Sequence, residues 1–270
     1  MTRTRSLRPL SDLGTEACSR ILGILCDLDD TLTTGGRVVP AAFDALWRAH
    51  DAGLRVVVVT GRPAGWADHL ARMWPVDAVV GENGAFYFHM KDGAMRRRWV
   101  DDEDTRLRNR DRLAELARHI PATVPGAAVS ADQFCRATDL AIDFCEDVPP
   151  LGRSDIDRIV EAFVAAGATA KVSSIHVNGW FGDYDKLRCC QLLARELWGE
   201  ELSEMRDHYT FCGDSPNDEP MFAFFPLAVA VANIVALQDR IVHLPAFVTP
   251  SAGGAGFAEL VDHLLAQRVR

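Results

Sequence analysis

The sequence predicts an α/β protein with a Rossmann-like, doubly wound parallel sheet and an inserted α+β domain. First, short apolar runs alternate with helical patterns near both ends of the chain, which is typical of βαβ units. Second, polar residues follow several of these runs, as they do at the edge of a parallel sheet that binds ligands. Third, this alternation stops between residues 85 and 182. We therefore expect a core of residues 1–84 and 183–270 and an insertion of residues 85–182.

The first expected strand, over residues 21–26, leads into three acids within four positions: Asp27, Asp29 and Asp30. A short apolar run bounded by polar residues suits a strand that is buried on both faces. Asp27 and Asp29 would point the same way if the strand continued through them. Adjacent carboxylates repel each other unless a cation or a proton compensates, and Mg²⁺ prefers such oxygen ligands. One carboxylate could then attack a substrate while the other carries a proton; taken alone, the motif also fits a solvated acidic loop.

The alternation of strands and helices continues after these acids. We expect a helix that begins at Pro40, carries Phe43, Leu46 and Trp47 on one face, and ends at Gly53. The next expected elements are a β-branched strand over 54–59, a helix over 63–73 and a short strand over 78–80. The polar segment 60–62 follows the first of these two strands.

The pattern changes after residue 84. The expected elements of the insertion are a hairpin over 85–100, a charged helix over 101–119 that Pro121 and Pro125 break, a strand over 137–144, a helix that begins at a Ser154 cap and runs to Ala166, and a strand over 171–180. Parallel βαβ units are not required to explain this order, so we interpret the insertion as a small α+β domain. The α/β pattern returns near Asp185, with strands over 209–212, 227–231 and 246–248 and a last helix over 256–267.

Composition restricts the functional class. The 270 residues are 48% hydrophobic and carry a net charge of −9, so non-specific nucleic-acid binding is not expected. No run of eighteen apolar residues occurs, which argues against a membrane span, and the first twenty residues do not read as a secretory signal. We expect those twenty residues to form a loose extension, the seven cysteines to stay reduced, and the protein to be cytoplasmic.

Four polar clusters fall at or near the ends of the expected core strands. They are Asp27 with Asp29, Thr60 with Gly61 and Arg62, Lys186, and Asp214 with Asn217 and Asp218. The strand ends of one parallel sheet meet at one edge, so these groups can lie close together. Asp214 would supply a third carboxylate for the cation, and Asp218 would bind it directly or support it. The Thr60 hydroxyl, the Gly61 amide and the Lys186 ammonium can hold the three oxygens of a phosphoryl group.

Together these motifs resemble those of the haloacid dehalogenase (HAD) superfamily phosphatases. The first motif is residues 27–31, the second 60–62, the third Lys186 and the fourth 213–218. The insertion lies between the second and third motifs, as in the type-IIB cap subfamily of sugar phosphatases, and residues 83–85 and 254–257 are also similar to that subfamily. The resemblance implies a HAD core with an inserted α+β cap domain. Mannosyl-3-phosphoglycerate, sucrose-phosphate and trehalose-phosphate phosphatases are the candidate groups, and the first is our nearest expectation.

The resemblance also implies a role for each motif residue. Asp27 is the nucleophile that forms an aspartyl-phosphate, and Asp29 protonates the leaving alcohol and then activates water. Mg²⁺ would lie between Asp27, the backbone carbonyl of Asp29 and Asp214, with Asp218 supporting the metal shell. The residues expected to bind phosphate are Thr60, Gly61, Lys186 and Asn217.

The expected substrate contacts are Arg62, Asn83, His176 and Asn178. Arg62 could bind substrate or cap a helix. In the strand expected over 171–180, one face would carry Ser174, His176, Asn178 and Trp180, because residues two apart share a face. Polar groups with an aromatic ring suit a sugar, although an ordinary half-solvated strand face fits the pattern equally.

The sequence therefore predicts a Mg²⁺-dependent phosphatase that hydrolyses a small phosphorylated sugar or glycosyl-phosphate metabolite. The expected partner is a small-molecule phosphate ester, with no nucleic acid and no membrane, and the protein would be a monomer or a homodimer. A phosphomutase or phosphoryl transferase on the same scaffold is the alternative, because it shares the covalent intermediate. A non-enzymatic binding protein is a third hypothesis, but all the residues that the reaction requires are present in the motifs.

Overall fold

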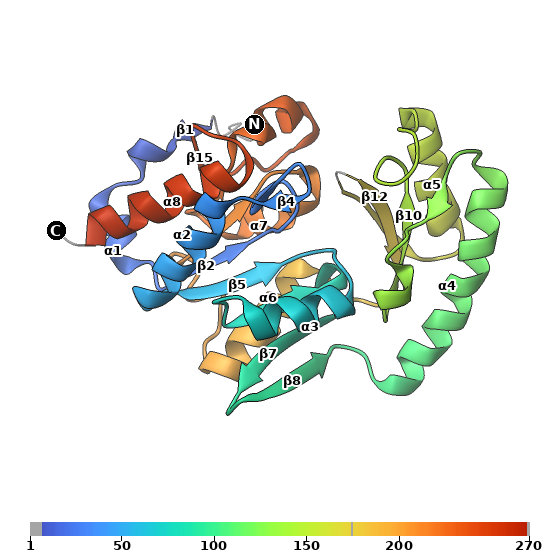
Figure 1. Cartoon of the computed structure of the whole chain (residues 1–270), viewed down its shortest axis with the longest axis horizontal. Coiled ribbons are helices and arrows are strands. Elements are labelled where there is room, and N and C mark those ends of the chain that lie inside the picture. Colours follow the sequence, from blue (N-terminus) through green and yellow to red (C-terminus); the bar gives the residue numbers. More distant parts are fainter. Residues whose placement is uncertain (1–6, 174, 269–270) are drawn as a thin grey trace.

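The computed structural model describes residues 7–173 and 175–268, so Ser174 lies outside the described residues. Figure 1 shows a larger layered part and a smaller part that contains α4 (Glu103–Thr123) and α5 (Arg153–Ala165). We call residues 101–182 the cap and the rest of the chain the core. Among the described residues, no helix is both long and apolar enough to cross a membrane.

A nine-stranded sheet forms the centre of the core. Its strand order is β1, β15, β14, β13, β2, β5, β6, β7 and β8, and neighbouring strands are parallel except for the pairs β6–β7 and β7–β8. In that order the strands are Arg8–Pro9, Phe247–Val248, Val229–Ala230, Tyr209–Gly213, Gly23–Cys26, Arg55–Val59, Ala78–Gly81, Phe86–Lys91 and Ala94–Trp99. The expected α/β class is confirmed. The strand that precedes Asp27 lies between β13 and β5, near the middle of the sheet.

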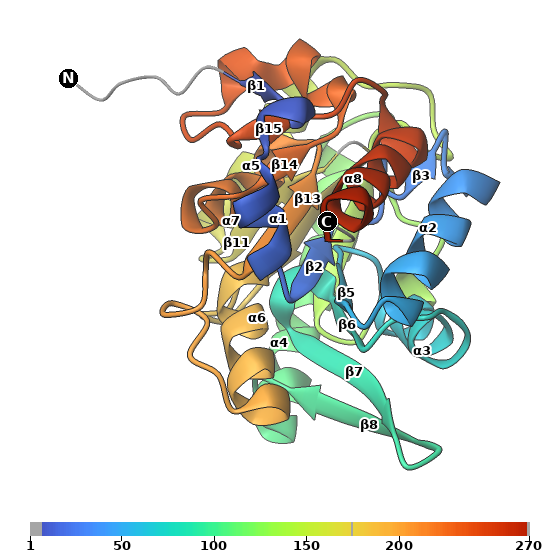
Figure 2. The same cartoon turned by 90° about the vertical axis from the view of Figure 1, so that its left-hand side faces the viewer.

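Helices cover both faces of this sheet, as the two views in Figures 1 and 2 show. One face carries α1 (Thr15–Arg20), α2 (Pro40–Asp51), α3 (Ala64–Met73) and α8 (Gly253–Arg268), and the other carries α6 (Lys186–Leu193), its π-helical continuation Ala194–Trp198 and α7 (Glu219–Phe224). Val56 and Val58 of β5 pack on the first face, whereas Val57 and Val59 pack on the second. Because both faces are covered, a continuous valine run suits this strand.

Several short elements complete the description of the chain. The two-stranded sheet of β3 (Thr33–Thr34) and β4 (Arg37–Val38) follows the acids of the first motif. A 3-10 segment, Ala232–Arg240, joins β14 to the last strand. The remaining short 3-10 turns are Leu10–Asp12, Glu82–Gly84, Gln133–Cys135 and Pro216–Asp218, of which the third belongs to the cap.

The N-terminal segment is packed against the core, so the expectation of a loose extension is wrong for residues 7–20. Leu10, Leu13 and Cys18 are buried, and β1 extends the sheet next to β15. Sequence patterning missed this segment because its apolar residues are separated by polar ones. On α2, Leu46 is buried, whereas Trp47 is 46% exposed.

The hairpin of β7 and β8 corrects the expected boundary at residue 85. It pairs with β6 and extends the core sheet, whereas the expectation assigned it to the insertion. The change from parallel to antiparallel pairing explains the change of sequence pattern at this point. Beyond this correction, the division of the chain into two domains stays a prediction.

The cap contains a four-stranded sheet with the order β11, β12, β10, β9, packed against α4 and α5. Its strands are Thr169–Val172, His176–Trp180, Asp139–Asp143 and Ala128–Val129. The single strand expected over 171–180 is a hairpin, because the chain turns between β11 and β12. Two other details differ: α4 continues through Pro121 to Thr123, and α5 begins after Gly152 without a side-chain cap from Ser154.

Candidate active site

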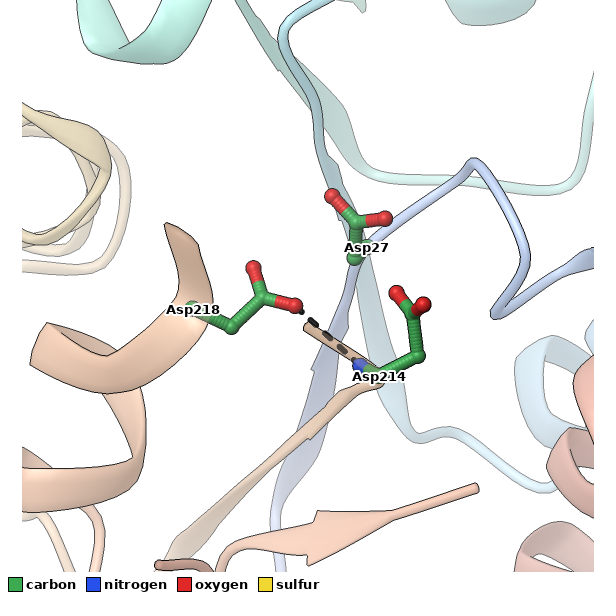
Figure 3. Close-up of side chains that lie close together, drawn as sticks. All are labelled: Asp27, Asp214 and Asp218. Atoms are coloured by element: carbon green, nitrogen blue, oxygen red, sulfur yellow. Dashed lines mark hydrogen bonds between the residues drawn. The ribbon is translucent and has the colours of Figure 1, made fainter. Parts of the chain in front are cut away.

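Three buried carboxylates meet at the centre of the sheet edge. Asp27 follows β2, Asp214 follows the neighbouring β13, and Asp218 belongs to the short turn after it. Each offers a carboxylate oxygen that lies within 4.8 Å of the others, and Figure 3 shows the three groups around a common space. The backbone amide of Asp214 donates a hydrogen bond of 3.2 Å to Asp218. A Cβ atom on Gly213 would lie 2.5 Å from that carboxylate, so glycine is needed there for Asp218 to approach.

Lys186 supplies the positive charge of this cluster. Its buried ammonium donates to Asp27 Oδ1 at 2.6 Å and to Asp218 Oδ1 at 2.8 Å. Lys186 is the first residue of α6, and the Asn83–Gly84 turn packs against this helix start. Gly84 has a φ of +107°, and a Cβ atom on it would lie 2.1 Å from the carbonyl oxygen of Asp185. The close approach of this glycine therefore helps to hold Lys186 beside the carboxylates.

The clustered carboxylates carry more negative charge than Lys186 compensates, so the site favours an additional cation. Burial raises the pKa of Asp27 to about 8, against the charge of Lys186 and with the help of the Asp218 and Asp29 carboxylates. Burial and the neighbouring carboxylates also raise the pKa of Asp214 well above its usual value. For Lys186, burial is outweighed by Asp218 and Asp27, so its pKa is raised. A hard divalent cation with oxygen ligands fits such a set of acids, because it relieves the repulsion that otherwise favours protonation.

Asn233 and Thr31 orient the Asp214 carboxylate. The Asn233 amide donates to Asp214 Oδ2 at 3.0 Å and to the carbonyl of Asp30 at 3.0 Å, and the Thr31 hydroxyl donates to Asp214 Oδ1 at 3.1 Å. Asp30 has a φ of +58°, in the left-handed region. Asn233 follows β14, so the rule that ligands lie beyond strand ends could have found it.

The second motif lies beside the acids, on the loop between β5 and α3. Thr60 is buried and accepts a hydrogen bond of 3.0 Å from the Arg62 amide. Asn83 lies behind this loop: its amide nitrogen and oxygen are each 3.2 Å from where a Gly61 Cβ would be. Asn83 does not line the cavity described below, and its expected contact with substrate stays a prediction.

Arg62 joins the core to the cap. Its guanidinium donates to both oxygens of Asp29, at 2.9 to 3.1 Å, and to Glu146 of the cap at 3.1 Å. Glu146 in turn lies 2.9 Å from Nε2 of His176. Burial of Arg62 is outweighed by the charge and hydrogen bonds of Asp29 and Glu146, so its pKa is raised. Arg62 therefore caps no helix in the way that the sequence suggested, but links two carboxylates.

A narrow cavity separates the acids from the cap. The core residues that line it are Asp27, Asp29, Gly61, Arg62, Ser215 and Asn217, and the cap residues are Arg136, Ser173, Ile175, His176 and Asn178. Its volume of about 20 Å³ holds about one water molecule. A larger groove of about 1220 Å³ adjoins it and shares Ser173 and Ser215 in its lining. Asp214 and Asp30 also line this groove, so the acid cluster adjoins the open side of the cap.

The sequence expectations for the cap are met in part. His176 and Asn178 share one face of β12 and line the cavity, and the Asn178 amide donates to Asp139 at 3.0 Å. Trp180 is buried in the core's apolar cluster and stacks on Tyr184, so its ring offers no platform for a sugar. The sequence analysis missed Arg136 and Glu146, because each lies in an irregular segment without a motif.

Comparison with known proteins agrees with this site. Residues 24–105 match the family model described as haloacid dehalogenase-like hydrolase. A phosphoglycolate phosphatase of Pyrobaculum neutrophilum is 29% identical over 245 residues, which cover 90% of this chain and 95% of the relative. These matches and the site indicate a phosphatase that resembles the haloacid dehalogenase-like hydrolases.

Solved structures share the fold over nearly the whole chain. The sucrose-phosphatase of Synechocystis sp. PCC6803, in complex with sucrose and phosphate, gives a TM-score of 0.63 at 18% identity and covers 90% of this chain and 97% of its own. A sugar phosphatase described as HAD subclass IIB gives 0.58 at 14% identity and covers 89% and 98%. The expected resemblance to HAD phosphatases is confirmed, and the chain shares its fold with a sugar phosphatase of subclass IIB.

Proposed function

We propose that the chain is a Mg²⁺-dependent phosphatase that hydrolyses a small phosphorylated sugar or glycosyl-phosphate metabolite. The observation that supports this proposal is the meeting of Asp27, Asp214 and Asp218 at the edge of the sheet, with Lys186 bonded to Asp27 and Asp218. Asp27, Asp214, Asp218 and the backbone of Asp29 would hold the cation. When bound, Mg²⁺ would offset the negative charge of the acids and of the phosphate.

The residues of the chain support a two-step reaction. In the first step a carboxylate oxygen of Asp27 attacks phosphorus, the bond from phosphorus to the leaving oxygen breaks, and Asp29 gives its proton to that oxygen. In the second step water attacks the phosphorus of the aspartyl-phosphate and Asp29 takes a proton from this water. The bond between phosphorus and the Asp27 oxygen breaks, which releases inorganic phosphate and restores the Asp27 carboxylate. Gly61 and Asn217 line the cavity where they would bind phosphate oxygens, and Lys186 holds Asp27.

The charges around the cavity favour a neutral leaving group. Arg62 is paired with Asp29 and Glu146, and Arg136 is paired with Asp139 at 3.0 Å and with Asp132 at 3.4 Å. The cations among the residues that line the cavity are therefore already compensated. Asn178 and Ser173 add uncharged polar groups. This supports a polyol such as a sugar over leaving groups that carry a carboxylate, which include glycolate and the glycerate of our nearest expectation.

A panel of phosphate esters tests the proposal, with release of inorganic phosphate as the readout. We expect hydrolysis of hexose phosphates in Mg²⁺, less hydrolysis of phosphoglycolate, loss of activity in EDTA, and recovery when Mg²⁺ is returned. Asp27→Asn should lose turnover while it stays folded. Preference for phosphoglycolate would contradict the sugar assignment, activity in chelator would contradict the metal, and a rearranged sugar phosphate would indicate a phosphomutase. A cytoplasmic location and a monomeric or dimeric state remain predictions.

A further inference from the structure

A continuous set of charged contacts runs from the proposed proton donor into the cap. Asp29 is held by Arg62, whose Nη2 bonds Asp29 Oδ1 at 2.9 Å and Glu146 Oε1 at 3.1 Å. Glu146 Oε2 is 2.9 Å from His176 Nε2 on β12. One guanidinium group thus contacts a core carboxylate and a cap carboxylate at the same time.

The cap presents Glu146 from a defined turn. Asp143, the last residue of β10, accepts hydrogen bonds from three successive backbone amides, those of Cys145 at 2.9 Å, Glu146 at 2.8 Å and Asp147 at 2.8 Å. Asp143 is 1% exposed. This buried carboxylate fixes the backbone of the turn, so the position of Glu146 follows the position of the cap sheet.

Both the core and the cap contact Arg62 on its other sides. The side chain of Arg62 is 6% exposed, its guanidinium carbon lies 4.5 Å from the centre of the Trp66 ring, and its Nη1 lies 3.6 Å from Asp132 of the cap. The planar guanidinium can form two-oxygen contacts with Asp29 only in a narrow range of orientations. Two cap carboxylates therefore help to set the orientation in which Arg62 meets Asp29.

We propose that Glu146 is a positioning residue, which orients Asp29 through Arg62 when the cap is closed. This inference rests on the proposed function, since it assumes that Asp29 transfers the proton in both steps. Opening of the cap withdraws Glu146 and releases Arg62 from its bridging orientation. Asp29 is then aligned for proton transfer only after the cap encloses the substrate. His176 supports Glu146 and has no direct part in the reaction.

Two substrates with different leaving groups separate positioning from a general structural effect. An alkyl phosphate needs a proton on its leaving oxygen, whereas p-nitrophenyl phosphate releases a phenolate that needs none. For both substrates, hydrolysis of the aspartyl-phosphate still needs Asp29 as a base. A misplaced Asp29 should therefore slow both steps for the alkyl phosphate but only the second step for p-nitrophenyl phosphate.

We would compare the wild type with Glu146→Gln, Glu146→Asp and Arg62→Lys, in Mg²⁺. The substrates are p-nitrophenyl phosphate and either glucose 6-phosphate or phosphoglycolate, whichever the wild type hydrolyses faster. We expect Glu146→Gln to lower kcat for the alkyl phosphate by about 10- to 100-fold, with KM changed less than about 3-fold. With p-nitrophenyl phosphate it should show a burst of about one phenolate per active site before slow turnover. Arg62→Lys should behave likewise, and Glu146→Asp should recover part of the loss.

Asp155→Asn is the matched control. Asp155 is another cap carboxylate with an arginine partner, Arg158 at 3.3 Å, but it lies on α5 and does not line the cavity. The kcat of the Asp155→Asn variant should stay within twofold of the wild-type kcat. The positioning role is overturned if the kcat of Glu146→Gln also stays within twofold of the wild-type value. It is likewise overturned if this variant loses activity and thermal stability together and shows no burst. In both cases the proposed phosphatase function still stands. A wild type that releases no phosphate from any of these esters would instead overturn the proposed function, and the inference with it.

Discussion

Gly84 illustrates how single residues set the geometry of the site. No charged or nucleophilic atom of this residue takes part in the chemistry, yet its backbone lies where any side chain would collide with Asp185, directly before Lys186. The positive φ of +107° adds a second reason for glycine. A buried ammonium that must contact two carboxylates thus depends on a turn located about one hundred positions earlier in the chain.

Substitution of this glycine gives a first prediction. Gly84→Ala should destabilise the protein by more than about 2 kcal/mol, because it adds backbone strain to a steric clash. Gly93→Ala is the control, since Gly93 has a φ of +71° but open space around its Cβ position, and it should cost about 1 kcal/mol. Denaturant unfolding measures both. Equal losses in the two variants would show that the close approach to Asp185 contributes nothing.

Glu146 links stability to pH. Hydrogen bonding from His176, together with the charge of Arg62, lowers the pKa of Glu146 to about 2. A carboxyl group whose pKa is lower in the folded state stabilises the fold above its unfolded pKa of about 4.3, and this contribution is lost as the pH falls toward 2. Because Glu146 is partly exposed, we expect its contribution to the free energy of unfolding to be about 1 kcal/mol.

The corresponding measurement is the free energy of unfolding of wild type and Glu146→Gln as a function of pH. The wild type should be more stable by about 1 kcal/mol near neutral pH, and the difference should vanish by about pH 2. A difference that grows as the pH falls would have the wrong sign and would contradict the lowered pKa.

At the residue scale, motifs predicted the acids but not their supports. Asp27, Asp214 and Lys186 could be placed together because each follows or begins an element at the same sheet edge, a rule that needs only the sequence pattern. Arg136 and Glu146 could not, because their positions depend on how the cap folds onto the core. Asn83 carries a recognisable motif, but its side chain supports Gly61 from behind, which the motif alone does not indicate.

At the scale of elements, the loop before β10 is fixed to the core by one buried carboxylate. Glu82, which follows β6, accepts hydrogen bonds from the Ala64 amide at the start of α3 at 2.9 Å and from the Ala137, Thr138 and Asp139 amides at 2.9, 2.6 and 3.2 Å. The Thr138 hydroxyl donates to it as well. A single side chain thus joins the first turn of a core helix to the cap segment that leads into its central strand.

Loss of this carboxylate should free the cap segment locally. In Glu82→Gln a nitrogen donor faces backbone donors, so we expect a destabilisation of about 1 to 3 kcal/mol and faster hydrogen exchange of the amides at 137–139. Glu259→Gln is the control: Glu259 accepts from the Ser251 amide at 2.9 Å in the core, and its loss should affect exchange at Ser251 only. Unchanged protection of 137–139 in Glu82→Gln would show that other contacts hold the segment.

Periodicity predicted most elements correctly, and its errors have physical causes. The β7–β8 hairpin was expected in the insertion because local alternation indicates a strand but not its partner. The hairpin of β11 and β12 was expected as one strand because its turn lacks glycine, proline and asparagine between residues 173 and 175. Pro121 did not end α4, because its missing hydrogen bond falls in the last turn of the helix.

At the scale of the whole molecule, one edge of the cap is attached to the core and the opposite edge adjoins the groove. Besides the Glu82 contacts, Arg136 donates to the Gly61 carbonyl at 2.9 Å, and a Cβ atom on Gly65 would lie 3.1 Å from the Cys135 Cβ. We therefore expect the cap to open on the side of the groove while the segment 133–139 stays in place.

A disulfide across the attached edge tests this motion. Gly65→Cys places a second thiol next to the native Cys135, with a Cβ separation that small shifts bring into the disulfide range. Mild oxidation should link core and cap and leave at least about half of the phosphatase activity, since the groove side stays free. The reduced variant is the control. An oxidised form that loses activity and regains it in reductant would show that the cap must also separate from α3.

The Glu82 contacts also affect how enzymes with this core and cap can change their substrate specificity. A core carboxylate that depends on cap amides, and a core guanidinium that depends on cap acids, make the two parts mutually adapted. A chimera that carries the cap of a distant relative would leave Glu82 buried with only its core donor, the Ala64 amide, unless the graft brought a matching loop. New specificities in this lineage would then arise more readily by point changes on the existing cap than by wholesale recombination of caps.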